Sequence, residues 1–119
     1  MLQLLDGSRK ELAKYIEEQN KKIVVYGAGM IGKVIIPDYL LQHNLLDRLQ
    51  FYVDMDKRKQ QEGIMIQEKH YEICSKESLF EMPENSILLI TNSNYGPVLK
   101  MLDGMRCLDG KETILFPVI

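Results

Sequence analysis

Short apolar runs recur along the chain and predict the strands of a buried sheet. The first, Ile23–Tyr26, is rich in β-branched residues and stops at a glycine, as expected of a parallel strand covered on both faces. Further runs of this kind are Leu49–Val53, Ile87–Ile90 and Thr113–Phe116. Two shorter pieces, Ile64–Ile66 and Tyr71–Ile73, also look strand-like, and we expect only the second to join the main sheet.

Helical spacings of apolar residues alternate with these runs. Helices are predicted over 8–20, from Met30 to about His43, from Ser75 to about Glu81, and from Tyr95 to about Asp103 with Gly104 closing the last one. Ser8 and Glu11 have the spacing of a capping box. Pro37 lacks a backbone donor, so it should kink or end the second helix near Ile36. The polar run Asp56–Glu62 is interpreted as a solvated loop.

The alternation of strands and helices predicts an α/β fold. Right-handed crossovers would give one three-layer Rossmann-like domain, with helices on both faces of a mostly parallel sheet of about five strands. We assign residues 1–20 to an N-terminal helical extension and residues 21–119 to the nucleotide-binding domain. The apolar ending Pro117–Ile119 suggests a fragment of a larger protein with a missing C-terminal catalytic domain.

Composition excludes several classes of function. The 119 residues include 15 Lys and Arg against 17 Asp and Glu, a formal charge of −2, which disfavours nucleic-acid binding. The apolar runs are shorter than the roughly 20 residues that cross a bilayer, so we expect a cytoplasmic chain without membrane insertion. Cys74 and Cys107 lie far apart, and His43 and His70 are the only imidazoles, so neither a metal site nor a disulfide framework is indicated.

The strongest motif follows the first predicted strand. Gly27, Ala28, Gly29, Met30, Ile31 and Gly32 fit GxGxxG and open a helix. In such a loop the first glycine allows the tight turn, the second lets the backbone approach a pyrophosphate, and the third lets the helix pack on the strand. Amides at the start of the helix would face the anion. The alternative interpretation is a tight turn in a fold that binds no ligand.

An acidic residue at the end of the next strand fits the same kind of site. Asp54 lies 22 residues after Gly32, close to the roughly 20 expected for a carboxylate that accepts the ribose hydroxyls. An acid at this place favours NAD or a nucleotide sugar over NADP. The cations 57–59 could instead meet a 2′-phosphate, although a solvated loop surface is the simpler interpretation.

A polar turn after the Ile87–Ile90 strand is the third candidate. The turn Asn92–Tyr95 would lie at the carboxyl edge of the sheet, where it could contact phosphate, ribose or sugar, or could only cap the next helix. Asn92 and Ser93 are its candidate site residues. The residues before Gly27 disfavour an S-adenosylmethionine loop. Motifs such as Tyr-x-x-x-Lys, HExxH and GxSxG are absent from the sequence, so the catalytic residues stay unknown.

Together, Val24–Gly29 with Gly32, Phe51–Asp54, Tyr71–Ile73 and Ser75–Leu79 resemble small Rossmann-like modules at the amino terminus of bacterial polysaccharide-biosynthesis proteins. Relatives of that kind include nucleotide-sugar dehydratases and epimerases, sugar acyltransferases, and domains that precede methyltransferases or glycosyltransferases. The resemblance implies phosphate contact by the glycine loop and ribose contact by Asp54. The acyltransferase pattern often has His or a small polar residue where this chain has Met30 and Ile31, which favours a dinucleotide.

Three functional hypotheses follow. The first is a nucleotide-binding module, holding NAD, or alternatively NADP or a uridine nucleotide sugar, for a cell-surface carbohydrate biosynthesis enzyme, without catalysis by this chain alone. The second is a fragment of an NAD-dependent oxidoreductase or epimerase whose catalytic residues lie elsewhere. The third is a non-binding interaction domain that organises a homodimer.

Overall fold

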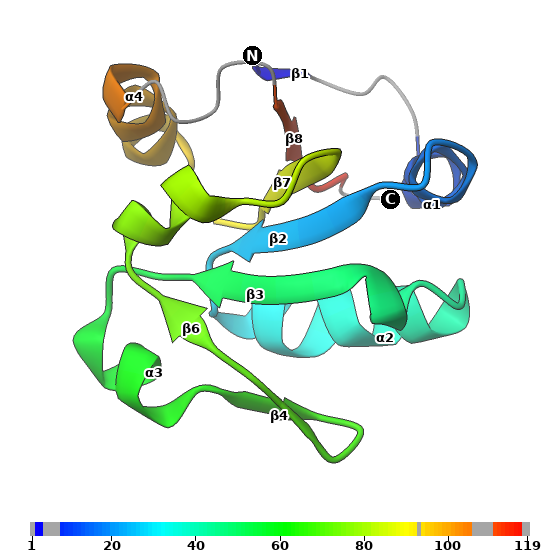
Figure 1. Cartoon of the computed structure of the whole chain (residues 1–119), viewed down its shortest axis with the longest axis horizontal. Coiled ribbons are helices and arrows are strands. Elements are labelled where there is room, and N and C mark those ends of the chain that lie inside the picture. The colour runs from blue at the N-terminus through cyan, green and yellow to red at the C-terminus, as the bar shows by residue number, and fades with distance from the viewer. Residues whose placement is uncertain (1, 4–7, 93, 106–110, 118–119) are drawn as a thin grey trace.

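The computed structural model describes residues 2–3, 8–92, 94–105 and 111–117. Its main sheet has six parallel strands in the order β1-β8-β7-β2-β3-β6 (Figure 1). Their bounds are Leu2–Gln3 for β1, Lys22–Tyr26 for β2, Leu49–Val53 for β3, Ile73–Cys74 for β6, Ser86–Ile90 for β7 and Glu112–Leu115 for β8. The predicted α/β domain with a mostly parallel sheet of about five strands is confirmed, and β1 adds a short sixth strand at one edge.

The strand order reverses its direction at the neighbouring strands β2 and β7. From β2 the chain moves outward to β3 and β6, and then returns to the other side of β2 to form β7 and β8. This is the doubly wound order, whose first and fourth strands are neighbours at the point where the winding direction reverses. Beyond β8, β1 stands where the usual order has a sixth strand that comes last in the chain.

Helices cover both faces of the sheet because alternate side chains of the buried strands point to opposite sides. On one face Val25 and Leu89 pack with α1 (Arg9–Glu18) and α2 (Ile36–Gln42). On the other face Val24 and Leu88 pack with a 3-10 helix, η3 (Lys76–Glu81), and with α4 (Gly96–Met105). The result is the expected three layers.

The first helix is part of this core. Ser8 caps α1 by accepting a hydrogen bond from the backbone N–H of Glu11 at 3.3 Å, as the capping pattern predicts. Leu12 and Ile16 are fully buried in the same cluster as the side chains of β2. Residues 9–18 therefore pack as one unit with the sheet that follows them.

The second predicted helix forms in two parts. Residues Ile31–Ile35 make a π-helical turn, η1, and α2 continues without a break from Ile36. Pro37 does not end the helix as one alternative predicted. It is the second residue of α2, directly after the π turn, so the change of helix type stands where the kink or end was expected.

The solvated loop predicted over 56–62 is wrong, because Lys57–Glu62 form a short helix, α3. Asp56 caps it by accepting hydrogen bonds from the N–H groups of Arg58 and Lys59. Gly63, with φ of +66°, ends it in a conformation that favours glycine. Two caps thus stabilise a helix that buries none of its own side chains.

The remaining elements adjust the predicted boundaries. Of the two short pieces, only the end of the second joins the main sheet. Strand β6 begins at Ile73, whereas Tyr71 belongs to β5 (Lys69–Tyr71), which pairs with β4 (Ile64–Ile66) in a separate antiparallel hairpin. A 3-10 turn, η2 (Leu46–Arg48), precedes β3. Gly104 does not close α4, since its φ is not positive and the helix runs to Met105.

Candidate functional site

A pocket of about 380 Å³ opens at the carboxyl edge of the sheet, between the ends of β2, β3 and β7. This is the switch point of the strand order, where ligands bind in open α/β sheets. Its volume falls within the range of small-molecule sites. Its lining residues come from the glycine loop, from the β3–α3 segment and from the turn after β7: Gly27, Gly29, Met30, Ile31, Asp54, Lys59, Thr91, Asn92 and Asn94.

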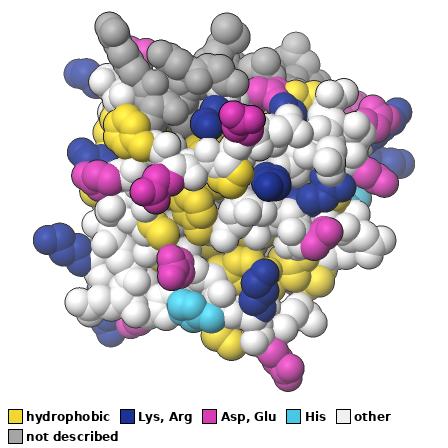
Figure 2. Space-filling view, viewed as in Figure 1, with side chains coloured by type: hydrophobic (Ala, Val, Ile, Leu, Met, Phe, Trp, Pro, Cys, Tyr) yellow, Lys and Arg dark blue, Asp and Glu magenta, His cyan; other side chains and the backbone are white. Residues whose placement is uncertain are grey.

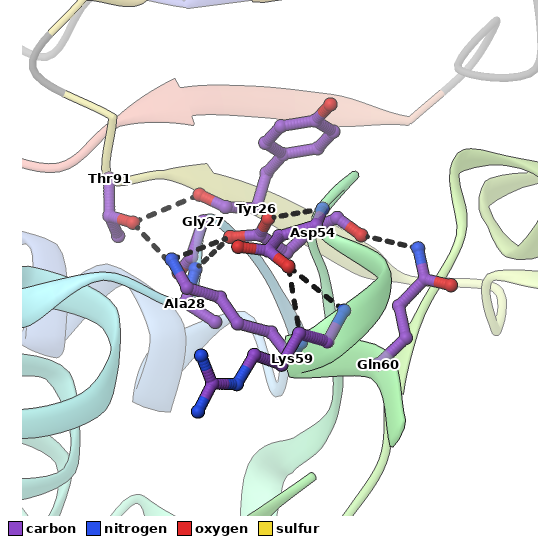
Figure 3. Close-up of polar contacts among 9 residues, drawn as sticks. Tyr26, Gly27, Ala28, Asp54, Lys59, Gln60 and Thr91 are labelled. Carbon is purple, nitrogen blue, oxygen red and sulfur yellow. Dashed lines mark hydrogen bonds and ion pairs between the residues drawn. The ribbon is translucent and has the colours of Figure 1, made fainter. Parts of the chain in front are cut away.

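Gly27 makes the tight turn that starts the loop. Its φ is +108°, and a Cβ there would lie 2.6 Å from oxygens of both Thr91 and Asn92. Its N–H donates to Val53 O at 2.8 Å. The Thr91 hydroxyl lies 2.9 Å from Tyr26 O and 3.1 Å from Gly27 O, so its hydrogen can serve either carbonyl. The turn is therefore fastened to both neighbouring strands (Figure 3).

The other two glycines of the motif have different surroundings. A Cβ on Gly32 would lie 2.0 Å from Gly27 O, so the helix could not pack against the turn with any larger residue. A Cβ on Gly29 would meet no atom within 4 Å, and its φ is not in the left-handed region. Gly29 nevertheless lines the pocket. The fold itself thus explains Gly27 and Gly32 but not Gly29.

The helix after the loop begins with a π turn that is tied to β3. Ile36 N–H donates to Ile31 O, five residues back, instead of to Gly32 O. In the π pattern Gly32 O would next need the N–H of residue 37, which Pro37 lacks. The buried Tyr52 hydroxyl supplies the donor, 2.7 Å from Gly32 O. Burial raises the pKa of Tyr52, so the hydroxyl keeps its hydrogen at neutral pH.

Asp54 links β3 to the glycine loop. Its Oδ2 accepts a hydrogen bond from Ala28 N–H at 2.9 Å and lies 3.7 Å from the Lys59 ammonium. Its Oδ1 accepts from Asp56 N–H at 2.9 Å. Gln60 Nε2 donates to the backbone oxygen of Asp54 at 2.7 Å. The carboxylate, with 15% of its side chain exposed, thus stands at the pocket wall with three partners (Figure 3).

Lys59 was predicted as a solvated surface residue, with a phosphate contact as the alternative. The structure places its side chain, 32% exposed, on the pocket wall beside Asp54. Helix α3 causes this, because it folds the segment back over the end of β3. The sequence did contain a signal, since Asp56 and Gly63 fit an N-cap and a C-cap at the two ends of the polar run.

The turn after β7 forms the opposite wall. Asn92 and Asn94 both line the pocket, and Asn94 is exposed. Asn92 Oδ1 is buried and has no hydrogen-bond partner among the described residues. Ser93, the other candidate in this turn, lies outside the described residues.

The structure thus brings most of the predicted residues to one place. Those that line the pocket are Gly27, Gly29, Met30, Ile31, Asp54 and Asn92. Ala28 contributes its N–H to Asp54, and Gly32 packs beneath the loop. Of the other lining residues, Lys59 and Asn94 lie in segments for which ligand contact was one of two interpretations, and Thr91 was not predicted as a site residue.

A second polar cluster lies at the opposite, amino-terminal edge of the sheet. Glu112, at the start of β8, accepts a hydrogen bond from the Tyr15 hydroxyl and forms an ion pair with Lys21. Burial opposes ionisation of Glu112, but the bonds from Lys21 and Tyr15 lower its pKa overall. Burial and the bond to Glu112 raise the pKa of Tyr15 to about 12. These groups hold α1 to the sheet.

The charged side chains over the described surface are mixed. Figure 2 shows acidic and basic groups interspersed on the face that it presents. Within the described ranges, three or more His, Cys, Asp or Glu side chains do not gather into a metal site. The described helices are all too short or too polar to cross a bilayer.

Comparison of the chain with protein-family models, with curated proteins and with solved structures gives no significant match.

Proposed function

We propose that this chain is a nucleotide-binding module that holds NAD or a nucleotide sugar in the pocket at the switch point. The observation that carries the proposal is Gly29. Neither backbone conformation nor a neighbouring atom requires glycine there, yet the residue faces the pocket. A ligand that approaches the backbone closely, as a pyrophosphate does in such loops, supplies the missing reason.

In this proposal, different residues of the pocket wall contact different parts of the ligand. Amides at the start of η1 would face the phosphates, as at other helix starts that follow a glycine loop. Asp54 would accept a ribose hydroxyl, because a carboxylate has about four acceptor sites and three partners occupy this one. Lys59 would add a positive charge at the same wall, which keeps NADP within the proposed ligands.

We further propose that the module serves a larger bacterial enzyme of cell-surface carbohydrate biosynthesis, in the cytoplasm, and does not turn over substrate alone. The sequence resemblance supports the biosynthetic role. The pocket also supports a binding role, since the ionisable and hydroxyl groups of its described lining already have partners: Asp54 pairs with Lys59 and accepts from Ala28 N–H, and the Thr91 hydroxyl lies beside two backbone carbonyls.

One observation favours a second candidate, a non-binding domain that organises a dimer. The three partners of the Asp54 carboxylate all belong to this chain, so its role can be explained as holding the glycine loop against the end of β3. In that case the pocket would be a by-product of the strand order. Nucleotide titration distinguishes the two candidates directly.

The test compares Gly29→Ala with a matched control, Gly104→Ala, by calorimetric titration with ADP, NAD, NADP, UDP-glucose and S-adenosylmethionine. A Cβ at either glycine meets no atom within 4 Å, but Gly104 lies in α4, away from the pocket. Both variants should keep or slightly raise thermal stability, by up to about 1 kcal/mol. Only Gly29→Ala should lose affinity, by about tenfold or more.

Two results would contradict the proposal. Absence of binding by all five ligands at millimolar concentration would leave the dimer-organising candidate. Equal affinity of Gly29→Ala and Gly104→Ala for a nucleotide would show that the ligand does not approach this backbone.

A further inference from the structure

Asn92 carries an acceptor atom that no group among the described residues satisfies. Its Oδ1 is buried against the glycine turn, 2.6 Å from the position that a Gly27 Cβ would occupy, and has no partner among the described residues. Thr91, the preceding residue, has its hydroxyl within reach of two carbonyls. An unpaired buried oxygen is unfavourable, so one in a pocket wall calls for a partner.

The position of Asn92 limits what that partner can be. Asp54 at the end of β3 and Asn92 after β7 stand on opposite sides of the glycine loop, which follows β2 between them. If the loop holds phosphates and Asp54 holds the nucleoside ribose, Asn92 faces the group attached beyond the phosphates. Phosphate oxygens only accept hydrogen bonds, whereas a hydroxyl can donate one to a carboxamide oxygen.

We propose that Asn92 accepts a hydrogen bond from a hydroxyl on the sugar beyond the diphosphate. The ligand class is then a nucleoside diphosphate joined to a sugar, which includes NAD and nucleotide sugars but excludes free nucleoside diphosphates as the preferred ligand. This inference rests on the proposed function. Oδ1 packs against Gly27 in the structure, and because the torsion at an Asn carboxamide is soft, we expect a rotation about it to bring Oδ1 to the ligand.

The experiment measures the gain in affinity that the second sugar provides. Titrations compare ADP-ribose with ADP, and UDP-glucose with UDP, in the unmodified chain and in Asn92→Ala, Asn92→Asp and Asn94→Ala. We expect the preferred sugar-bearing ligand to bind about tenfold more tightly than its diphosphate, the scale of one hydrogen bond. Asn92→Ala should abolish this gain and leave the affinity for the diphosphate unchanged.

The other variants identify the atom that acts. Asn92→Asp keeps the acceptor and should keep the gain, because any repulsion of the phosphates affects both members of a ligand pair. Asn94→Ala, at the exposed Asn of the same wall, should keep the gain as well. Thermal melting of Asn92→Ala should show no loss of stability, since Oδ1 has no partner within the described fold.

Each contrary outcome has a defined meaning. If the sugar still increases the affinity of Asn92→Ala, Asn92 is not the acceptor. If the increase is lost in Asn92→Asp, the acceptor role also fails, because the amide nitrogen must then donate. If Asn92→Ala is less stable than the unmodified chain, the premise that Oδ1 has no partner in the described fold is wrong. If the diphosphates bind but their sugar forms bind no better, this inference fails and the proposed function stands. If no nucleotide binds the unmodified chain, both fail.

Discussion

Removal of the Tyr52 hydroxyl should destabilise the protein through the first turn of the loop helix. In Tyr52→Phe the carbonyl of Gly32 loses its donor at 2.7 Å, in a place that water does not reach. Leaving a buried acceptor unpaired costs about 1–3 kcal/mol, a large share of the roughly 5–15 kcal/mol that stabilises a domain.

The reason for this cost can be tested with Pro37. Without the proline ring, the segment can return from the π pattern to the α pattern, in which Ile36 N–H donates to Gly32 O. In a Pro37→Ala background, Tyr52→Phe should therefore cost less than in the unmodified chain, by about 1 kcal/mol. Urea unfolding of the four proteins of this double-mutant cycle gives the coupling free energy.

Tyr26→Phe is the matched control. The Tyr26 hydroxyl contacts the sulfur of Met101 at 3.9 Å, a weak acceptor, so its loss should cost less than about 0.5 kcal/mol in either background. The reasoning is refuted if Tyr52→Phe costs no more than Tyr26→Phe. It is also refuted if the effects of Tyr52→Phe and Pro37→Ala add within about 0.5 kcal/mol.

Three further predictions concern the charged groups. Asp54→Ala should weaken the binding of a ribose-containing ligand by about 1–3 kcal/mol, measured by calorimetry. It should also lower the melting temperature, because Ala28 N–H loses its acceptor. Unchanged affinity would show that Asp54 only holds the glycine loop in place. Lys59→Met should lower affinity for NADP more than for NAD, by about 1 kcal/mol at this partly exposed site, and an equal effect on both would remove the 2′-phosphate role. The fold raises the pKa of Tyr15 from 10.0 to about 12, which means that it favours the protonated hydroxyl. The resulting contribution to the free energy of unfolding is fully present below pH 10 and is lost as pH rises to about 12. The fold lowers the pKa of Glu112, so the stability that its ionised form contributes is lost as pH falls through the acid range. Urea unfolding of Tyr15→Phe across pH should show no loss of stability between pH 10 and about 12 from this residue.

The strands and the place of the site could be predicted because they depend on strong local patterns. Buried parallel strands such as β2 and β7 need nearly continuous apolar residues, so they are visible as runs in the sequence. Parallel strands end at one edge, which brings Asp54 and Asn92 to the glycine loop without further information.

The features that could not be predicted depend on contacts between distant residues. Helix α3 buries no side chain, so periodicity could not reveal it, and the position of Lys59 follows from that helix. The sequence shows that Pro37 disturbs a helix, but the π turn depends on a hydroxyl from Tyr52, on another strand. The unpaired oxygen of Asn92 likewise becomes visible only when its surroundings are known.

The pairing of β1 with β8 has a consequence for the order of folding. Leu2 lies opposite Thr113, so this contact joins segments separated by nearly the whole described chain. On a ribosome β1 emerges before β8 and has no partner until β8 has been made. Before the rest of the sheet has formed, closing so long a loop costs entropy that a two-residue strand repays poorly, so β1 should dock last. We therefore expect the β1–β8 edge to open before the five-residue strands β2, β3 and β7, which carry the pocket.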